Sequence, residues 1–99
     1  RDIVSLRDIV SSDVVFHSPT FGKPMPGPDV LLIVLESVTE VFGESFTYHR
    51  QWLSPDGRDW ALEFTATVRG IPIKGIDLIT LNEHGKICKF EVVMRPYKG

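Results

Sequence analysis

The chain has 99 residues, of which 42% are hydrophobic and 24% charged, and its formal net charge is −2 at pH 7. This length is typical of a single domain with one core. No run of lysine or arginine suggests a nucleic-acid or acidic-membrane partner, and the longest apolar run, "VLLIVL" (residues 30–35), is far shorter than a membrane span. The single cysteine, Cys88, excludes a disulfide framework and suggests a reducing, cytoplasmic setting.

The first 28 residues predict short elements. Residues 1–10 predict a helix that Ser11 and Ser12 end, with an apolar face formed by Ile3, Leu6 and Val10. Residues 13–19, "DVVFHSP", are typical of a brief strand that proline stops. The prolines and glycines of residues 20–28 predict a loop.

Residues 28–42 predict the main helix. Pro28 suits a first turn, Asp29 favours the positive end of the helix dipole, and Gly43 is a natural stop. The apolar residues follow helical spacing, at Leu31, Val34, Leu35, Val38, Val41 and Phe42. Several are β-branched and poor helix formers, so packing against an apolar surface must hold this helix.

The residues after Gly43 predict four antiparallel strands. "PDG" (residues 55–57) and "NEHG" (residues 82–85) are hairpin turn sequences, and Gly85 can supply a positive φ. The strand that begins at Arg58 has one apolar face, formed by Trp60, Leu62, Phe64, Ala66 and Val68. Helices on one face of an antiparallel sheet define an α+β domain, and long strands facing one helix should curl into a cone-shaped half-barrel with an interior pocket.

Strict alternation places Tyr48, Arg50 and Trp52 together on one strand face. Two aromatics and an arginine are what an interface core favours. A pocket wall would also accept Trp52.

Asp77 is the residue that fits its strand least, because Ile76 and Leu78 flank it and aspartate is depleted in strands. Ile73, Gly75, Ile79 and Leu81 share its face, and Phe90 should lie roughly opposite, with Cys88 and Val92 on the face of Phe90. These neighbours are apolar and should favour the protonated acid. Asp77 is therefore either a structural aspartate paired near the rim of the sheet, or an acid or base facing the interior.

Three stretches carry a family resemblance: "SSDVVFHSP", "DGRDWALEFTATVRG" and "GIDLITLNEHGKICKFEVVMRP". In this order they resemble the nuclear transport factor 2-like superfamily, in particular its polyketide cyclase (SnoaL-like) and ketosteroid isomerase branch. The resemblance covers nearly the whole chain. It implies a single cone-fold domain over residues 1–99 that lacks the first helix of the family, with truncated ends or a partner closing the opening.

The superfamily contains isomerases, dehydratases, cyclases, epoxide hydrolases and noncatalytic binding modules, so the resemblance implies the fold more firmly than the activity. Asp77 matches the protonated aspartate that forms part of the isomerase oxyanion hole. Ser18 stands where those enzymes have their general base, and their first-helix tyrosine has no counterpart, so steroid isomerase activity is not expected. Gly75 stands where the epoxide hydrolases have an arginine, which counts against that chemistry too.

The resulting hypothesis is a cone-fold protein that binds a small hydrophobic molecule and is either a cofactor-independent isomerase, dehydratase or cyclase, or a noncatalytic binding or dimerisation module. Asp77 would be catalytic. His17 or Ser18 would supply a polar group at the mouth, since only one of these neighbours can point inward. The other ligand-binding candidates are apolar or aromatic, at Phe16, Trp60, Phe64, Phe90 and Met94. Neither a metal nor a cofactor is expected, and the resemblance implies a homodimer through the outer sheet face.

Overall fold

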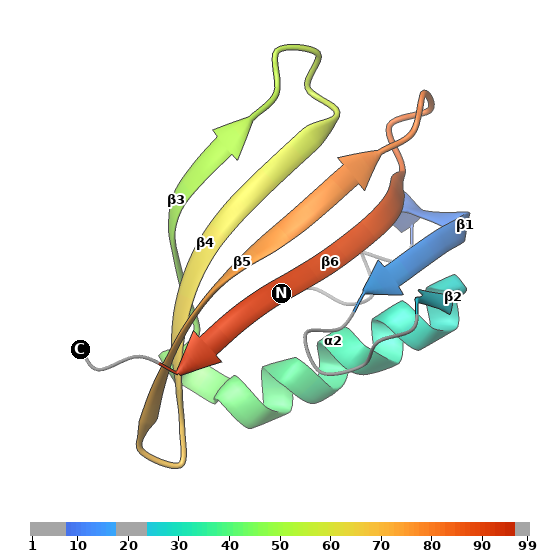
Figure 1. Ribbon diagram of the computed structural model, residues 1–99. Helices are drawn as coiled ribbons and strands as arrows, with labels where there is room; N and C mark the ends of the chain where they lie inside the picture. The colour runs from blue at the N-terminus through green and yellow to red at the C-terminus, as the bar shows by residue number, and fades with distance from the viewer. Residues whose placement is uncertain (1–7, 18–23, 97–99) are drawn as a thin grey trace.

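The computed structural model describes residues 8–17 and 24–96. In chain order the elements are β1 (Val10–His17), β2 (Met25–Pro26), α2 (Pro28–Phe42), the 3-10 turn η1 (Gly43–Ser45), β3 (Thr47–Leu53), β4 (Asp59–Val68), β5 (Ile71–Leu81) and β6 (Ile87–Pro96). The strands form one sheet in the order β2-β1-β6-β5-β4-β3, and α2 lies against its concave side (Figure 1). This arrangement confirms the α+β cone that the sequence predicts.

The sheet is mixed rather than wholly antiparallel. The pairs β3–β4, β4–β5 and β5–β6 are antiparallel as expected, but β1 runs parallel to β6 and pairs on its other side with the short β2. The prediction that residues 1–10 form a helix ended by Ser11 and Ser12 is wrong from Val10 onward, because β1 begins there. Val10 is buried and pairs with Ile87, so β1 covers an edge of β6 that would otherwise be unpaired. Ile3 and Leu6 lie outside the described residues.

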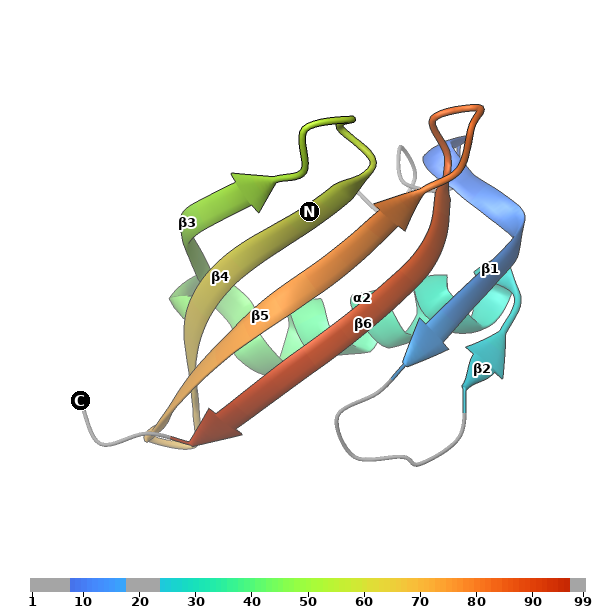
Figure 2. The same cartoon turned by 45° about the horizontal axis from the view of Figure 1, so that its top comes forward.

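The helix α2 begins at Pro28 and ends at Gly43, as predicted, with Asp29 in its first turn. Figure 2 shows α2 crossing behind the curled sheet. Leu31 and Leu35 join a buried cluster with β1, β5 and β6, and Phe42 joins a second cluster with Phe64 and Ala66. Packing at both ends therefore compensates for the poor intrinsic propensity of the helix.

The predicted apolar face of α2 needs one change. Val41, which the spacing predicts on that face, is exposed, and Leu32, which it does not predict there, is buried.

The faces of β4 and β5 follow the predicted alternation. Phe64 and Ala66 are buried on the side that faces α2. The register along β5 and β6 differs from the expectation, because Val92 lies opposite Asp77 and Phe90 opposite Ile79. A register shift after Thr80 also pairs Ile87 with Leu81, and both of these line the interior. The prediction that Cys88 shares the face of Phe90 is therefore wrong: Ile87 takes that place, and the Cys88 thiol donates to the Thr80 carbonyl oxygen at 3.5 Å.

Gly75 is the point of closest approach in the sheet. A Cβ on this residue would lie 2.5 Å from Phe64 Cζ, 2.7 Å from the Val93 carbonyl oxygen and 2.8 Å from Met94 Cβ. Two of these atoms belong to the backbone or sit next to it, so they cannot move aside easily. Glycine is required here for space rather than for its φ angle.

Glu63 anchors the outer side of the sheet. Arg50 donates to both of its carboxylate oxygens, at 2.9 Å and 2.8 Å, and Lys74 Nζ lies 3.3 Å from Oε2. These partners lower the pKa of Glu63 from its ordinary 4.5 to about 2, with the Arg50 hydrogen bonds as the largest cause and desolvation acting in the opposite direction. Glu63 therefore stays ionised through the physiological range as a structural charge.

We expect Gly75→Ala to lower the free energy of unfolding by about 1–3 kcal/mol, because the added methyl overpacks the contact with Phe64. Chemical denaturation measures the loss. The double variant with Phe64→Leu is the control, and its loss should be smaller than the sum of the two single losses. Additive losses would argue against the Phe64 contact as the cause.

We also expect Glu63→Gln to change the acid dependence of stability. Since the pKa of Glu63 is lower in the folded state, its contribution is fully present above about pH 4.5 and is lost as the pH falls toward about 2. The difference in unfolding free energy between the wild type and Glu63→Gln should thus be largest near pH 7 and shrink below pH 4.5. Urea titrations at pH 7, 4 and 2.5 test this, and a difference independent of pH would contradict it.

Candidate functional site

A cavity of about 290 Å³ lies between α2 and the inner face of the sheet. The strands supply most of its wall, through Trp60, Leu62, Ile79, Leu81, Ile87 and Phe90. Leu35 closes the wall from α2, and the exposed residues Ile9 and Gly85 lie at its edge. Because almost all of these side chains are apolar, the cavity suits a hydrophobic molecule.

Tyr48 also lines this cavity, and a bulge in β3 is what places it there. Tyr48 pairs with Phe64, but the register shifts before Gln51, which pairs with Leu62. The two residues between them both bond to outer-face side chains: His49 Nε2 lies 2.6 Å from Thr65 Oγ1, and Arg50 binds Glu63. Tyr48 therefore faces inward while Arg50 faces outward.

This bulge corrects the sequence analysis. Tyr48, Arg50 and Trp52 do not share one face, because alternation is interrupted between the first and the second. Arg50 and Trp52 remain together on the outer side, with the guanidinium carbon 5.1 Å from the Trp52 ring centroid. Nothing in the residue types of "TYHRQWL" signals the extra residue, so the sequence alone does not identify Tyr48 as a site residue.

Asp77 lies next to the cavity without lining it. It is only 1% exposed, and the Tyr48 hydroxyl donates a hydrogen bond to its Oδ2 at 2.9 Å. Its neighbours across the sheet are Leu62 and Val92, both apolar. Asp77 and Glu63 are two buried carboxyl groups of the described chain, and they differ in surroundings: Asp77 faces the interior beside a neutral hydroxyl, and Glu63 lies outside between two cations.

The other predicted ligand-binding residues are divided among several places. Trp60 and Phe90 line the cavity. Phe16 packs in the first buried cluster, with its ring 6.2 Å from that of Phe90. Phe64 lies in the second cluster, where Met94 packs against it. The first cluster borders the cavity, because Ile79 and Phe90 belong to both, and the second cluster fills the interior near the end of α2.

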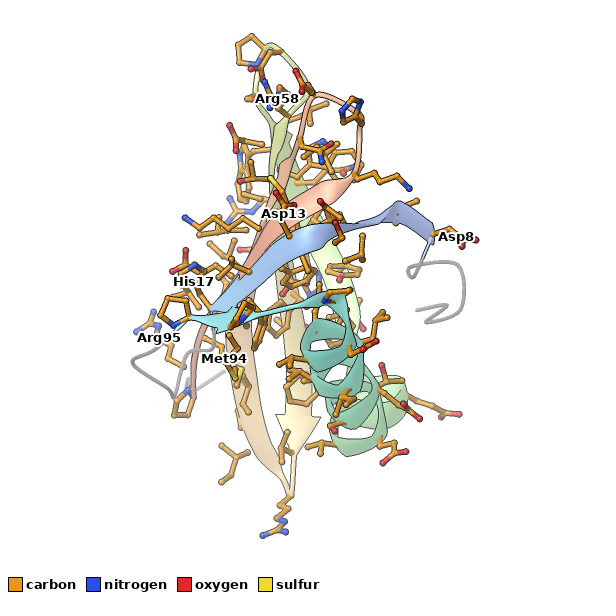
Figure 3. The ribbon with its side chains drawn as sticks, turned by 90° about the vertical axis from the view of Figure 1, so that its right-hand side faces the viewer. Asp8, Asp13, His17, Arg58, Met94 and Arg95 are labelled. Carbon is orange, nitrogen blue, oxygen red and sulfur yellow. The ribbon has the colours of Figure 1, made fainter. Side chains whose placement is uncertain are left out.

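His17 and Ser18 are not brought to the cavity by the described structure. His17 pairs with Glu91 in the register of β1 and β6, one position beyond the inward Phe16–Phe90 pair. It therefore lies on the side of the sheet away from α2, where Arg95 also lies (Figure 3). Ser18 lies outside the described residues.

Two further features, a metal site and a membrane-spanning helix, are not found among the residues that the structure describes. They contain no set of three or more histidine, cysteine, aspartate or glutamate side chains that could hold a metal ion. Within the same ranges, no helix combines the length and the apolar character needed to cross a membrane.

Residues 1–90 match the family model of the SnoaL-like domain. A steroid delta-isomerase from Pseudomonas aeruginosa is 43% identical over 96% of this chain and 69% of its own, with a TM-score of 0.89. A protein with a cystatin-like fold from Silicibacter pomeroyi is 46% identical over 97% of this chain and 66% of its own, with a TM-score of 0.87. The epoxide hydrolase/cyclase-like enzyme SalBIII, at 15% identity and a TM-score of 0.71, shares the fold.

The curated proteins include no match to this sequence. The chain spans about two-thirds of the length of the Pseudomonas aeruginosa and Silicibacter pomeroyi proteins. The family match covers nine-tenths of the chain, in agreement with the resemblance read from the sequence. The chain belongs to the SnoaL-like domain family.

Proposed function

We propose that this protein binds a compact hydrophobic molecule in the cavity of its cone. The observation that carries the proposal is the apolar cavity of about 290 Å³ with one tyrosine in its wall. This volume is at the lower end of the range of about 300–1,000 Å³ typical of small-molecule sites. A wall of aliphatic and aromatic side chains favours a ligand without charge.

The reaction class that fits the site is proton transfer without a cofactor: isomerisation, dehydration or cyclisation. The Tyr48–Asp77 pair is the support for this, because a buried carboxyl group bonded to a hydroxyl at a cavity wall can take or give a proton. The relatives are in keeping with it, since one is described as a steroid delta-isomerase and another as an epoxide hydrolase/cyclase-like enzyme. Asp77 remains our candidate for the acid or base, exchanging its proton with the ligand through the Tyr48 hydroxyl that it bonds.

A noncatalytic role is the second candidate, and the outer face of the sheet favours it. Trp52, Ala61, Leu78 and Glu91 form a row across four strands, in which Trp52 and Leu78 are exposed. Val93 adds a further exposed apolar side chain in the next row, opposite Ile76. Exposed aromatic and aliphatic residues beside an arginine are typical of an interface, so we also propose that this face pairs two copies of the chain.

Naphthalene is a suitable probe of the cavity. We expect it to bind the wild type and to shift the NMR signals of Leu62, Ile79 and Phe90. Leu62→Phe should weaken binding by about tenfold or more, since the larger ring occupies cavity space. Ile33→Phe on the exposed side of α2 is the matched control and should bind as the wild type does. Failure of the wild type to bind naphthalene would argue for an interior without a ligand.

Leu78→Lys tests the outer face. The lysine lies opposite Glu91, so the monomer should keep its fold, but the charge would be buried in an interface between two sheets. We expect the wild type to be dimeric at micromolar concentration and Leu78→Lys to be monomeric by light scattering. Ile33→Lys, on α2, should remain dimeric. A monomeric wild type, or a variant that stays dimeric, would contradict pairing through this face.

A further inference from the structure

We infer that Tyr48, rather than Asp77, is the group that contacts the ligand, and that the ligand is a one- or two-ring molecule whose hydroxyl donates a hydrogen bond to the Tyr48 oxygen. This inference rests on the proposed function, since it requires that the cavity binds a small molecule.

The first step is access. Tyr48 lines the cavity and is 43% exposed, whereas Asp77 is 1% exposed and stands behind the wall. A molecule in the cavity therefore meets Tyr48 before Asp77, without any movement of the sheet. To reach the Asp77 carboxyl group it would have to displace Tyr48 from its 2.9 Å hydrogen bond.

The second step is the placement of the Tyr48 ring. Phe46 meets it edge to face, with the centroids 4.9 Å apart, and Phe46 in turn stacks on the buried Phe64 at 4.9 Å. One end of Tyr48 is thus held by the second cluster and the other end by Asp77. A side chain fixed at both ends presents its oxygen to the cavity at little entropic cost when a ligand binds.

The third step is the direction of the hydrogen bond. The Tyr48 hydrogen is directed to Asp77, and a phenolic oxygen that donates its hydrogen can still accept a hydrogen bond. Among the described residues of the cavity wall, the one other polar side chain is Trp60, whose indole only donates. Tyr48 therefore provides the side-chain acceptor of the wall, and a phenol or enol hydroxyl is the group that matches it.

The fourth step is the part played by Asp77. By accepting the Tyr48 hydrogen it fixes which way the hydroxyl points, and so makes the oxygen an acceptor toward the cavity. Asp77 is in this sense a positioning residue. A ligand hydroxyl, Tyr48 and Asp77 would then form one chain of hydrogen bonds from the cavity to the buried carboxyl group.

Three ligands of nearly equal shape test the inference: naphthalene, 2-methoxynaphthalene and 2-naphthol. NMR titration of the wild type should give a dissociation constant for 2-naphthol roughly fivefold below those of the other two, the effect of one net hydrogen bond. In Tyr48→Phe, which removes a single oxygen, the three constants should become equal while naphthalene binds as before. Asp77→Val, which removes the acceptor of the Tyr48 hydrogen, should reduce the preference for 2-naphthol and leave naphthalene binding unchanged.

The possible outcomes separate the two proposals. If naphthalene binds but 2-naphthol is not preferred, or if Tyr48→Phe keeps the preference, this inference is wrong and cavity binding stands. If 2-methoxynaphthalene binds as tightly as 2-naphthol, the ligand oxygen accepts rather than donates, which also overturns it. If none of the three binds, the proposed function fails and this inference falls with it.

Discussion

The contact between the Phe64 ring and Gly75 is the constraint on which the interior depends. With no Cβ on β5 at this point, the ring of Phe64 lies directly against the sheet and is buried with Phe42 and Ala66. That cluster fills the interior near the end of α2 with the chain's own side chains. The aromatic contacts continue through Phe46 to Tyr48, which lines the cavity. The close packing at this end of the cone therefore supports the position of Tyr48 in the cavity wall.

The sequence is sufficient to predict which residues share a face in the central strands β4 and β5. It is insufficient in β3 and β6, where a bulge interrupts the alternation. Period-two alternation correctly placed Phe64 and Ala66 on one apolar face, because β4 and β5 pair without interruption. One extra residue in β3 and another in β6 interrupt the alternation. As a result Arg50 and Cys88 do not lie on the sheet face that strict alternation predicts for them. Residue types do not signal such an extra residue, because it changes the pairing between two strands and not the composition of either.

The same limit applies to the site. Residue types alone predicted that Asp77 lies among apolar neighbours, and this holds at Leu62 and Val92. They could not separate a cavity wall from a packed core, because both are built from the same side chains: Trp60 lines the cavity, Phe16 and Phe64 are in core clusters, and Phe90 belongs to both. The sequence also did not predict that β1 pairs in parallel with β6. This pairing places Phe16 beside the inward Phe90, so His17, the next residue, faces outward.

The two buried carboxyl groups explain why our proposal places proton transfer in the interior rather than on the outer face. Glu63 is bonded to Arg50 and lies beside Lys74, so its charge is compensated. These partners hold the pKa of Glu63 far below the physiological pH range. Asp77 lies on the other side of the same sheet, where Tyr48 offers a neutral hydroxyl and the cross-strand neighbours are apolar. A carboxyl group with compensated charge stabilises a fold, whereas one beside a neutral donor at a cavity wall can exchange a proton when a ligand changes its surroundings. The bulge in β3 creates this difference, because it directs Tyr48 toward Asp77 and Arg50 toward Glu63.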